Sequence, residues 1–367
     1  MPTAEDIEYE SKVAQQEADE KAWRLDKARE NVKARKAESA LKTPPATSAI
    51  LSDRYQRERT DIPWLVEDRA RHGHNVIVPA RYKAGKTTLF ASLIACLADG
   101  DAFLGKHAVT PPEGRIAFWD YEMEDDDTDD YLREARVCKP DRVAVENLKG
   151  FYVPFATSDA AFRWAVEWHK VNETGVWVID SLTKVAAQHG ISQRSDEIGV
   201  ILDAIDKIKE DAGIESVIVS CHIPHAVQEG EERAYGDQSI SAWADVIWPL
   251  SRTNGSQDRF ISSLGRRVPE LEAEQVELRD GRVVLTGLGR DEAAAAEIDE
   301  RVMAALLAPG RSENPLTRTQ LYREVKGQEQ RIRASVGRLQ ERGLVRVLQA
   351  GKSDLIISQS LTIPHNP

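Results

Sequence analysis

The residues with the clearest chemical pattern are those from 80 to 88. They follow a β-branched run at 75–78, precede an apolar run at 89–97, and fit the pattern A/G-x4-G-K-S/T with Ala80 in the first position. In this pattern, backbone N–H groups at a helix N-terminus hold phosphate, the lysine contacts phosphate oxygens, and the hydroxyl contacts Mg²⁺. The segment therefore predicts binding of a nucleoside triphosphate, ATP, together with Mg²⁺.

The predicted nucleotide-binding residues are Ala80, Arg81, Tyr82, Lys83, Ala84, Gly85, Lys86, Thr87 and Thr88. Among them, Thr87 is also the predicted metal ligand. A glycine turn without a ligand is the alternative, but a strand pattern before the segment and a helix pattern after it favour the phosphate loop.

Two acidic residues stand at the ends of apolar runs. Asp180 closes the run 176–179, and Glu122 lies between Tyr121 and Met123. Hydrolysis of ATP needs one carboxylate near Mg²⁺ and a second that orients water against the γ-phosphate. Acids at strand ends beside a phosphate loop are typical of function, so Asp180 is the predicted metal-side acid and Glu122 the predicted catalytic base. The alternative for each is an exposed surface carboxylate.

Strand and helix patterns alternate from residue 62 to about 290. Strands are predicted at 115–123, 148–153, 176–181, 216–222 and 244–250, with edge strands at 258–263 and 282–286, and helices at 158–171 and 196–210. This alternation predicts an α/β fold with a mostly parallel sheet whose ligands bind at the carboxyl ends of the strands.

The two ends of the chain differ from this core. Residues 1–45 form a predicted charged helical arm and linker, which either stands in solvent or docks on a neighbouring subunit through Trp23 and Leu25. From 291 to 367, three helix patterns and a hairpin pattern predict a winged helix-turn-helix.

From Arg311 to Asp354 the sequence has ten basic and five acidic residues, although the whole chain carries a net charge of −12. Arg331, Arg333 and Arg338 on the third helix and Lys352 on the hairpin are therefore predicted DNA contacts. A winged helix that docks on protein is the alternative.

Composition bounds the remaining choices. The 367 residues include 30% charged side chains and only three scattered cysteines, which indicates a reducing, cytoplasmic environment. No apolar run approaches the ~20 residues of a membrane span, and the N-terminus lacks the pattern of a signal peptide. The acidic balance argues against a protein that coats DNA uniformly.

Several segments together resemble the RecA-like ATPases of the DnaB and RepA replicative-helicase type. They are 62–66, 121–123 and 179–181, together with 239–247, which is similar to the family signature SIEQDADVV. Residues 192–198 fall where that family has a DNA-facing loop. The resemblance covers about residues 60–290 and implies a RecA-like P-loop ATPase core of the kind found in AAA family ATPases of phages or plasmids.

Carried over to this sequence, the resemblance implies roles for further residues. His222 would be the γ-phosphate sensor, and Arg266, with Arg267 close behind, would reach the nucleotide of a neighbouring subunit. Arg194 and Arg233 would lie in loops that face single-stranded DNA, although acidic residues around Arg233 disfavour tight binding. A zinc site at Cys221, His222 and His225 is the less favoured interpretation, because no fourth ligand is evident.

The function that follows is a ring-forming motor ATPase, a hexamer that acts on DNA in replication or recombination. Replication proteins would bind through the N-terminal arm or the winged helix, and no membrane is involved. The alternatives are an ATP-dependent DNA-binding regulator, a partition-type switch, and a recombination mediator without unwinding activity.

Overall fold

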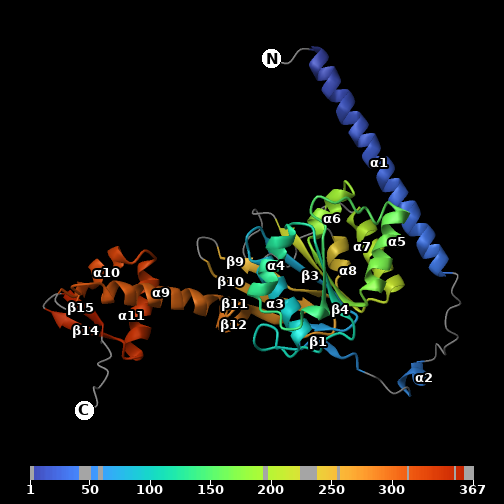
Figure 1. The fold of residues 1–367 in the computed structure, drawn as a ribbon. Helices are drawn as coiled ribbons and strands as arrows, with labels where there is room; N and C mark the ends of the chain where they lie inside the picture. The colour runs from blue at the N-terminus through green and yellow to red at the C-terminus, as the bar shows by residue number, and fades with distance from the viewer. Residues whose placement is uncertain are drawn as a thin grey trace. The chain divides into compact units, whose positions relative to one another are not determined.

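The computed structural model describes residues 4–40, 51–56, 61–192, 197–223, 238–253, 257–311, 314–350 and 353–358. These residues belong to two compact units, Met1–Thr286 and Gly287–Pro367. Figure 1 shows the helices and strands of both units.

The first unit is built on a ten-stranded sheet with the order β12-β11-β10-β8-β3-β7-β6-β4-β5, in which β9 pairs with β10 and β3. Strands β3, β4, β5, β6 and β7 are parallel, and β10 runs antiparallel to β8, β9 and β11. The bounds are β3 Asn75–Arg81, β4 Arg115–Asp120, β5 Val143–Asn147, β6 Thr174–Asp180, β7 Ser216–Ile223, β8 Val246–Ile247, β9 Leu250–Arg252, β10 Arg259–Gly265, β11 Leu271–Arg279 and β12 Arg282–Gly289.

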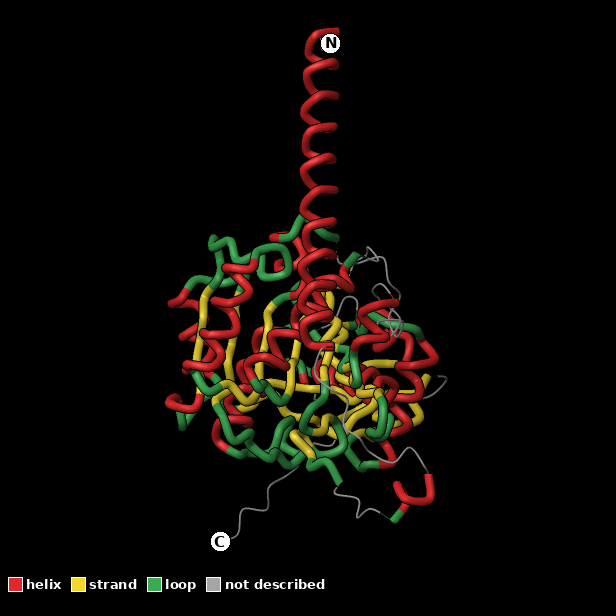
Figure 2. The backbone as a smooth tube through the Cα atoms, turned by 90° about the vertical axis from the view of Figure 1, so that its right-hand side faces the viewer, coloured by secondary structure: helices red, strands yellow, loops and turns green. Residues whose placement is uncertain are grey.

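Helices cover the sheet, and Figure 2 shows them on either side of the strands. They are α3 Lys86–Asp99, α4 Asp125–Glu134, α5 Asp159–Val171, α6 Leu182–Gln188, α7 Ile198–Ala212 and α8 Gln238–Trp243. Two short elements, α2 Leu51–Tyr55 and the 3-10 turn Pro140–Arg142, and the strand pair β1 Trp64–Val66 and β2 Ala70–Arg71 complete the unit.

Successive side chains of the central strands point to opposite faces of the sheet and pack in two separate hydrophobic cores. Val76 and Val78 pack with α3, whereas Ile77 packs on the other face with α5 and α7. Both faces are buried, which explains why the parallel strands read as continuous apolar runs in the sequence. The predicted mostly parallel α/β sheet is therefore confirmed.

Three strand predictions differ from the structure. The strand expected at 148–153 lies earlier, at β5, because Gly150 adopts a positive φ of 79° in the loop that follows. The run 244–250 divides into β8 and β9 around Trp248–Pro249, where proline offers no N–H to a ladder. Strand β11 was not predicted, because its segment LEAEQVELR carries too many charges to read as a buried strand.

Helix α1, Ala4–Ala40, lies in the segment where a charged helix was predicted. Leu25 is buried in the core that contains α5 and α7, and Ala28 is also buried. Asn31 Nδ2 donates a hydrogen bond to the Thr157 carbonyl oxygen at 3.1 Å. Leu25 thus packs on its own chain instead of a neighbouring subunit, whereas Trp23 is 67% exposed.

The second unit contains α9 Arg290–Leu307, α10 Arg318–Glu324 and α11 Glu329–Glu341, and an antiparallel sheet in the order β13-β15-β14. The strands are β13 Leu316–Thr317, β14 Val345–Ala350 and β15 Ser353–Ser358. Side chains from all three helices and the sheet form one small core, which includes Val302, Leu321, Ile332 and Ile356. Within the described ranges of both units, no helix has the length and apolar character to cross a membrane.

Candidate nucleotide-binding site

The segment from Ala80 to Thr88 forms a tight loop between β3 and α3. Lys83 and Gly85 adopt left-handed conformations, with φ values of 62° and 96°, and Gly85 is the N-cap of α3. A helix N-terminus presents unpaired N–H groups and the positive end of the helix dipole, so this geometry suits phosphate. Glycine is favoured at 85 because other residues rarely adopt a φ of 96°, and a Cβ there would also lie 3.0 Å from Nε of Arg259.

The loop residues differ in exposure. Ala80, Arg81, Ala84 and Lys86 are buried, Tyr82 and Lys83 are exposed, and Gly85, Thr87 and Thr88 are half-buried. Thr87 in the first turn of α3 is thus accessible for the metal role predicted from the sequence.

A chain of hydrogen bonds joins the loop to the predicted catalytic base. Lys86 Nζ donates to His222 Nδ1 at 2.8 Å, and His222 Nε2 lies 2.8 Å from Glu122 Oε1. Because an ammonium group can only donate, Nδ1 accepts and Nε2 carries the proton that is donated to Glu122. Ser181 Oγ donates a second hydrogen bond to the same carboxylate oxygen at 2.5 Å.

These contacts keep Glu122 ionised. Its partial burial by itself would raise the pKa of Glu122, but the hydrogen bonds from His222 and Ser181 and the nearby charge of Lys86 outweigh burial and lower it to about 2. At neutral pH, Glu122 is a carboxylate that can accept a proton from water. This is the protonation state that a catalytic base requires.

Asp180 is only 1% exposed at the end of β6, and Ser220 Oγ on β7 donates a hydrogen bond to its Oδ1. Burial and the nearby Glu122 charge raise the pKa of Asp180 to about 6. Lys86 is buried beside it, and burial lowers the pKa of Lys86 while Asp180 and Glu122 oppose that change. The two acids predicted from the sequence therefore lie in one site with the loop lysine.

Asp120 is a site residue that sequence reasoning missed. It is fully buried at the end of β4, and its Oδ1 accepts the N–H groups of Glu122 at 2.8 Å and Met123 at 3.1 Å. Its Oδ2 accepts Thr128 Oγ1 at 2.9 Å, and Asn147 Nδ2 donates to that hydroxyl at 2.7 Å. Asp120 therefore ends the strand and fixes the backbone that carries Glu122. The only sequence signal was a second acid two residues before Glu122.

Arg259 on β10 was also missed. Its Nε donates to the Ala84 carbonyl oxygen at 2.9 Å and thereby contacts the phosphate loop within the same chain. By contrast, Arg266 at the other end of β10 is exposed, and its N–H donates to the Asp245 carbonyl oxygen at 2.8 Å, near the start of β3. Because the phosphate loop follows the end of β3, Arg266 lies away from its own loop, and a role at a neighbouring subunit stays a prediction.

The predicted DNA contacts are placed as follows. Arg194, Arg233 and Lys352 lie outside the described residues. Arg331 and Arg333 are exposed on α11. Arg338 donates to Asp299 Oδ1 at 2.6 Å and to the Ala295 carbonyl oxygen at 3.2 Å, so the structure gives it partners within its own unit. Contact of these residues with DNA stays a prediction.

The residues present fit Mg²⁺ better than zinc. A P-loop magnesium site needs a hydroxyl and a carboxylate, here Thr87 and Asp180, because phosphate oxygens and water supply the remaining ligands. Burial raises the pKa of Cys221 to about 12, which disfavours the thiolate that zinc requires. The two ring nitrogens of His222, which zinc would need, already have partners: Nδ1 contacts Lys86 and Nε2 contacts Glu122. In the part of the chain that the structure describes, no group of three or more His, Cys, Asp or Glu side chains is arranged to hold a metal by itself.

A phosphate loop on a mostly parallel sheet, with acids at the ends of the strands beside it, defines the class of the protein as a RecA-like P-loop ATPase. A family model described as an AAA domain matches residues 37–228, more than half of the chain, and the chain belongs to that family. No curated protein matches the chain.

Among solved structures, the chain is similar to a KaiC-like protein from the hyperthermophilic archaeon Pyrococcus horikoshii OT3. The sequence identity is 18%, the TM-score is 0.41, and the match covers 63% of this chain and 98% of the other.

Proposed function

We propose that this chain is an ATP-hydrolysing motor that acts on DNA, of the hexameric replicative-helicase type. The hydrolytic part rests on one observation, the hydrogen-bonded chain from Lys86 through His222 to Glu122. It connects the residue that contacts phosphate with an ionised base, so a γ-phosphate that engages Lys86 also changes the surroundings of Glu122 and His222.

The residues divide the hydrolytic work between them. The N–H groups of the loop and Lys86 bind the β- and γ-phosphates, and Glu122 orients and deprotonates the attacking water. Thr87 and Asp180 would hold Mg²⁺, which neutralises phosphate charge when bound. His222 then reports the presence of the γ-phosphate, because it contacts both Lys86 and Glu122.

The motor part of the proposal concerns assembly. Arg266 is exposed at the end of β10 and lies away from its own phosphate loop, which suits an arginine that acts on the nucleotide of a neighbouring subunit. A hexameric ring would place Arg194 and Arg233 toward single-stranded DNA. Replication proteins would contact the N-terminal arm or the winged helix.

The second unit is proposed to be a winged helix. Three helices followed by the β14–β15 hairpin have the order of that motif, and Arg331 and Arg333 are exposed on the third helix. This observation also favours a second candidate function, an ATP-dependent DNA-binding regulator or recombination mediator that does not unwind DNA.

ATP turnover with and without single-stranded DNA, together with molecular mass by light scattering, separates these functions. Strong stimulation by DNA and ATP-dependent hexamers would support the motor. Turnover that is indifferent to single strands, on a monomer or dimer that binds duplex DNA, would favour the regulator.

The variant Lys86→Ala tests the hydrolytic part. We expect it to abolish nucleotide binding or turnover, because the buried ammonium contacts phosphate. The exposed neighbour Lys83→Ala serves as the control and should retain more activity. Normal turnover by Lys86→Ala would refute the assignment of the phosphate loop.

A further inference from the structure

A cavity of about 130 Å³ adjoins the phosphate loop on the side away from Glu122. Its lining includes Gly85, Thr88, Leu89, Arg259, Val276 and Leu278. Since liquid water takes about 30 Å³ per molecule, the cavity has room for a ring and not only for solvent. Gly85 and Thr88 belong both to the phosphate loop and to the lining of the cavity. A ligand whose phosphates are held by the loop could therefore extend into the cavity.

Most of the side chains that line the cavity are aliphatic, and Thr88, Arg259 and Glu277 are its polar residues. Arg259 on β10 lies directly opposite Val276 on β11, so both side chains project from the same face of the sheet. Leu278, two residues further along β11, projects from that face as well and is 61% exposed. An exposed leucine beside a buried valine and a guanidinium makes a surface suited to a flat, aromatic group.

Arg259 is held in place by the loop itself. Its Nε donates to the Ala84 carbonyl oxygen at 2.9 Å, which fixes the guanidinium next to Gly85. A guanidinium group anchored through Nε can still offer its planar face to a ring, and this stacking is a property of arginine that lysine lacks.

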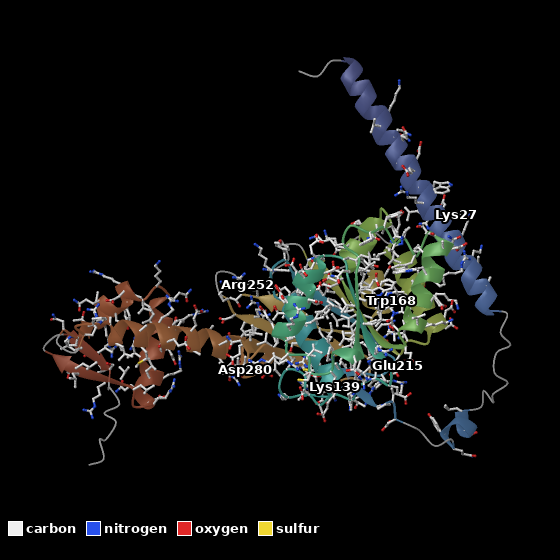
Figure 3. All side chains as sticks on the ribbon, in the orientation of Figure 1. Lys27, Lys139, Trp168, Glu215, Arg252 and Asp280 are labelled. Atoms are coloured by element: carbon white, nitrogen blue, oxygen red, sulfur yellow. The ribbon has the colours of Figure 1, made fainter. Side chains whose placement is uncertain are left out.

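The opposite wall is also fixed before any ligand binds. Arg282 on β12 donates to Asp99 Oδ2 at 2.8 Å, and Val283 N–H donates to Ser92 Oγ at 3.0 Å. Both acceptors lie on α3, so β12 is tied to the helix that carries the phosphate loop. Asp280, labelled in Figure 3, lies in the turn between β11 and β12. The pocket is therefore preformed, which limits the entropic cost of binding.

We propose that this cavity is the nucleobase pocket, in which the base of the bound nucleotide lies against Arg259, Val276 and Leu278. The inference rests on the proposed binding of a nucleoside triphosphate and names the part of that ligand the pocket recognises. Glu277 also borders the cavity, but its carboxylate accepts a hydrogen bond from Arg279 and, by strand alternation, faces away from Val276. The pocket contacts the face of the base by stacking and not the polar groups at its edge. It therefore favours purines, which have the larger face, over pyrimidines, and discriminates little between adenine and guanine, which differ at the edge.

The test compares affinities of the full chain for ATP, GTP, CTP and inorganic tripolyphosphate in the presence of Mg²⁺, by calorimetry. We expect ATP and GTP to bind within a few-fold of each other, CTP more weakly, and tripolyphosphate weakest. Arg259→Ala should weaken ATP binding about tenfold, as expected for loss of a cation–π and stacking contact. It should leave tripolyphosphate binding within about twofold.

Two further variants test the same pocket with changes that are not expected to unfold the protein. Arg259→Lys retains the charge but cannot stack, and Leu278→Ser alters an exposed side chain, so both should reduce the ratio of ATP to CTP affinity in a folded protein. Arg163→Ala, at an exposed arginine of α5 that does not line the cavity, is the control and should leave that ratio unchanged.

The possible failures are distinguishable. Equal losses of ATP and tripolyphosphate affinity in Arg259→Ala would overturn the inference and make Arg259 a support of the loop only. Wild-type affinity for CTP equal to that for ATP would overturn it as well. If the chain bound none of the four ligands, the proposed function itself would fail.

Discussion

Asp180 combines nearly complete burial with a negative charge at neutral pH. Burial and the neighbouring Glu122 charge raise its pKa from 3.8 to about 6. A raised carboxyl pKa means that the folded chain holds the proton more tightly than the unfolded chain does. The stability of the fold therefore falls as pH rises from 3.8 through about 6, and the full cost is present at neutral pH.

Asp180→Asn should remove this cost. At pH 7, we expect the variant to be more stable than the wild type by up to about 3 kcal/mol, since each unit of pKa is worth about 1.4 kcal/mol, and to lose ATP hydrolysis. Thermal unfolding followed by circular dichroism at several pH values measures the effect, and the gain should shrink as pH falls from 6 toward 3.8. Glu113→Gln, at an exposed position, is the control. A constant gain across this range would contradict the explanation.

Substitutions of Glu122 and of Asp120 are expected to lower kcat to different extents. Glu122→Gln should keep ATP binding and lower kcat by a factor of about 10² to 10⁴, as expected for loss of a general base. Asp120→Asn leaves the base in place but weakens its support, because the amide cannot accept from Thr128 and from two N–H groups in the same way.

For Asp120→Asn, we therefore expect kcat to fall about 10- to 100-fold, as for a small displacement of a catalytic group, with KM little changed. Steady-state kinetics of both variants measures the difference, and Thr128→Val should show a weaker form of the same effect. Unchanged kcat in Asp120→Asn would show that the Glu122 backbone does not need this carboxylate.

At the scale of the element, helix α11 contains a glycine at a position where neither the backbone conformation nor the packing requires one. Gly337 lies inside the helix, and a Cβ at that position would meet nothing within 4 Å. Gly343, just beyond the helix, also has open space but has a φ of +69°. The two positions therefore differ in backbone conformation and not in packing.

Gly337→Ala should stabilise the second unit by about 1 kcal/mol, because alanine has the higher helix propensity. Gly343→Ala is the matched control and should destabilise it by about 1–2 kcal/mol, because a left-handed conformation strains alanine. Calorimetric unfolding of the full chain measures both changes. Destabilisation by Gly337→Ala would show that α11 is not a regular helix at this position.

Local signals predicted most helices but not every strand. The parallel strands are apolar throughout, because both of their faces are buried. Strand β11 alternates glutamate with other residues and has little to distinguish it from a charged loop, yet it supplies Val276 and Leu278 beside the phosphate loop. Its place in the sheet depends on pairing with β10, which local propensity does not encode.

At the scale of the whole molecule, the boundary between the two compact units falls inside β12. Strand β12 runs from Arg282 to Gly289, and Arg282 and Val283 are bound to α3. A truncation that preserves the first unit must therefore end after this strand.

A chain that ends at Gly289 should fold and retain ATP binding, because the site lies entirely in the first unit. A chain that ends at Arg279 should be much less stable, because it loses the Arg282–Asp99 ion pair and the buried Val283. Nucleotide binding and thermal unfolding of both truncations measure this. If the longer truncated chain failed to fold, the two units would depend on each other.

The sequence by itself determined the local chemistry of this protein. A phosphate loop is a continuous segment, and the acids Glu122 and Asp180 each end an apolar run, so neighbouring residues carry these signals. The alternation of strands and helices determined the parallel sheet in the same way.

Only the tertiary structure decided how these parts meet. Lys86 and His222 are 136 residues apart in the chain, and Glu122 and His222 are 100 apart, yet both pairs are in hydrogen-bond contact. The same holds for Arg259, which is 175 residues from Ala84. These contacts depend on the order and register of β3, β7, β6 and β4 and on the pairing of β10 at the sheet edge. Those features are set by packing between distant segments, and no local pattern in the sequence records them.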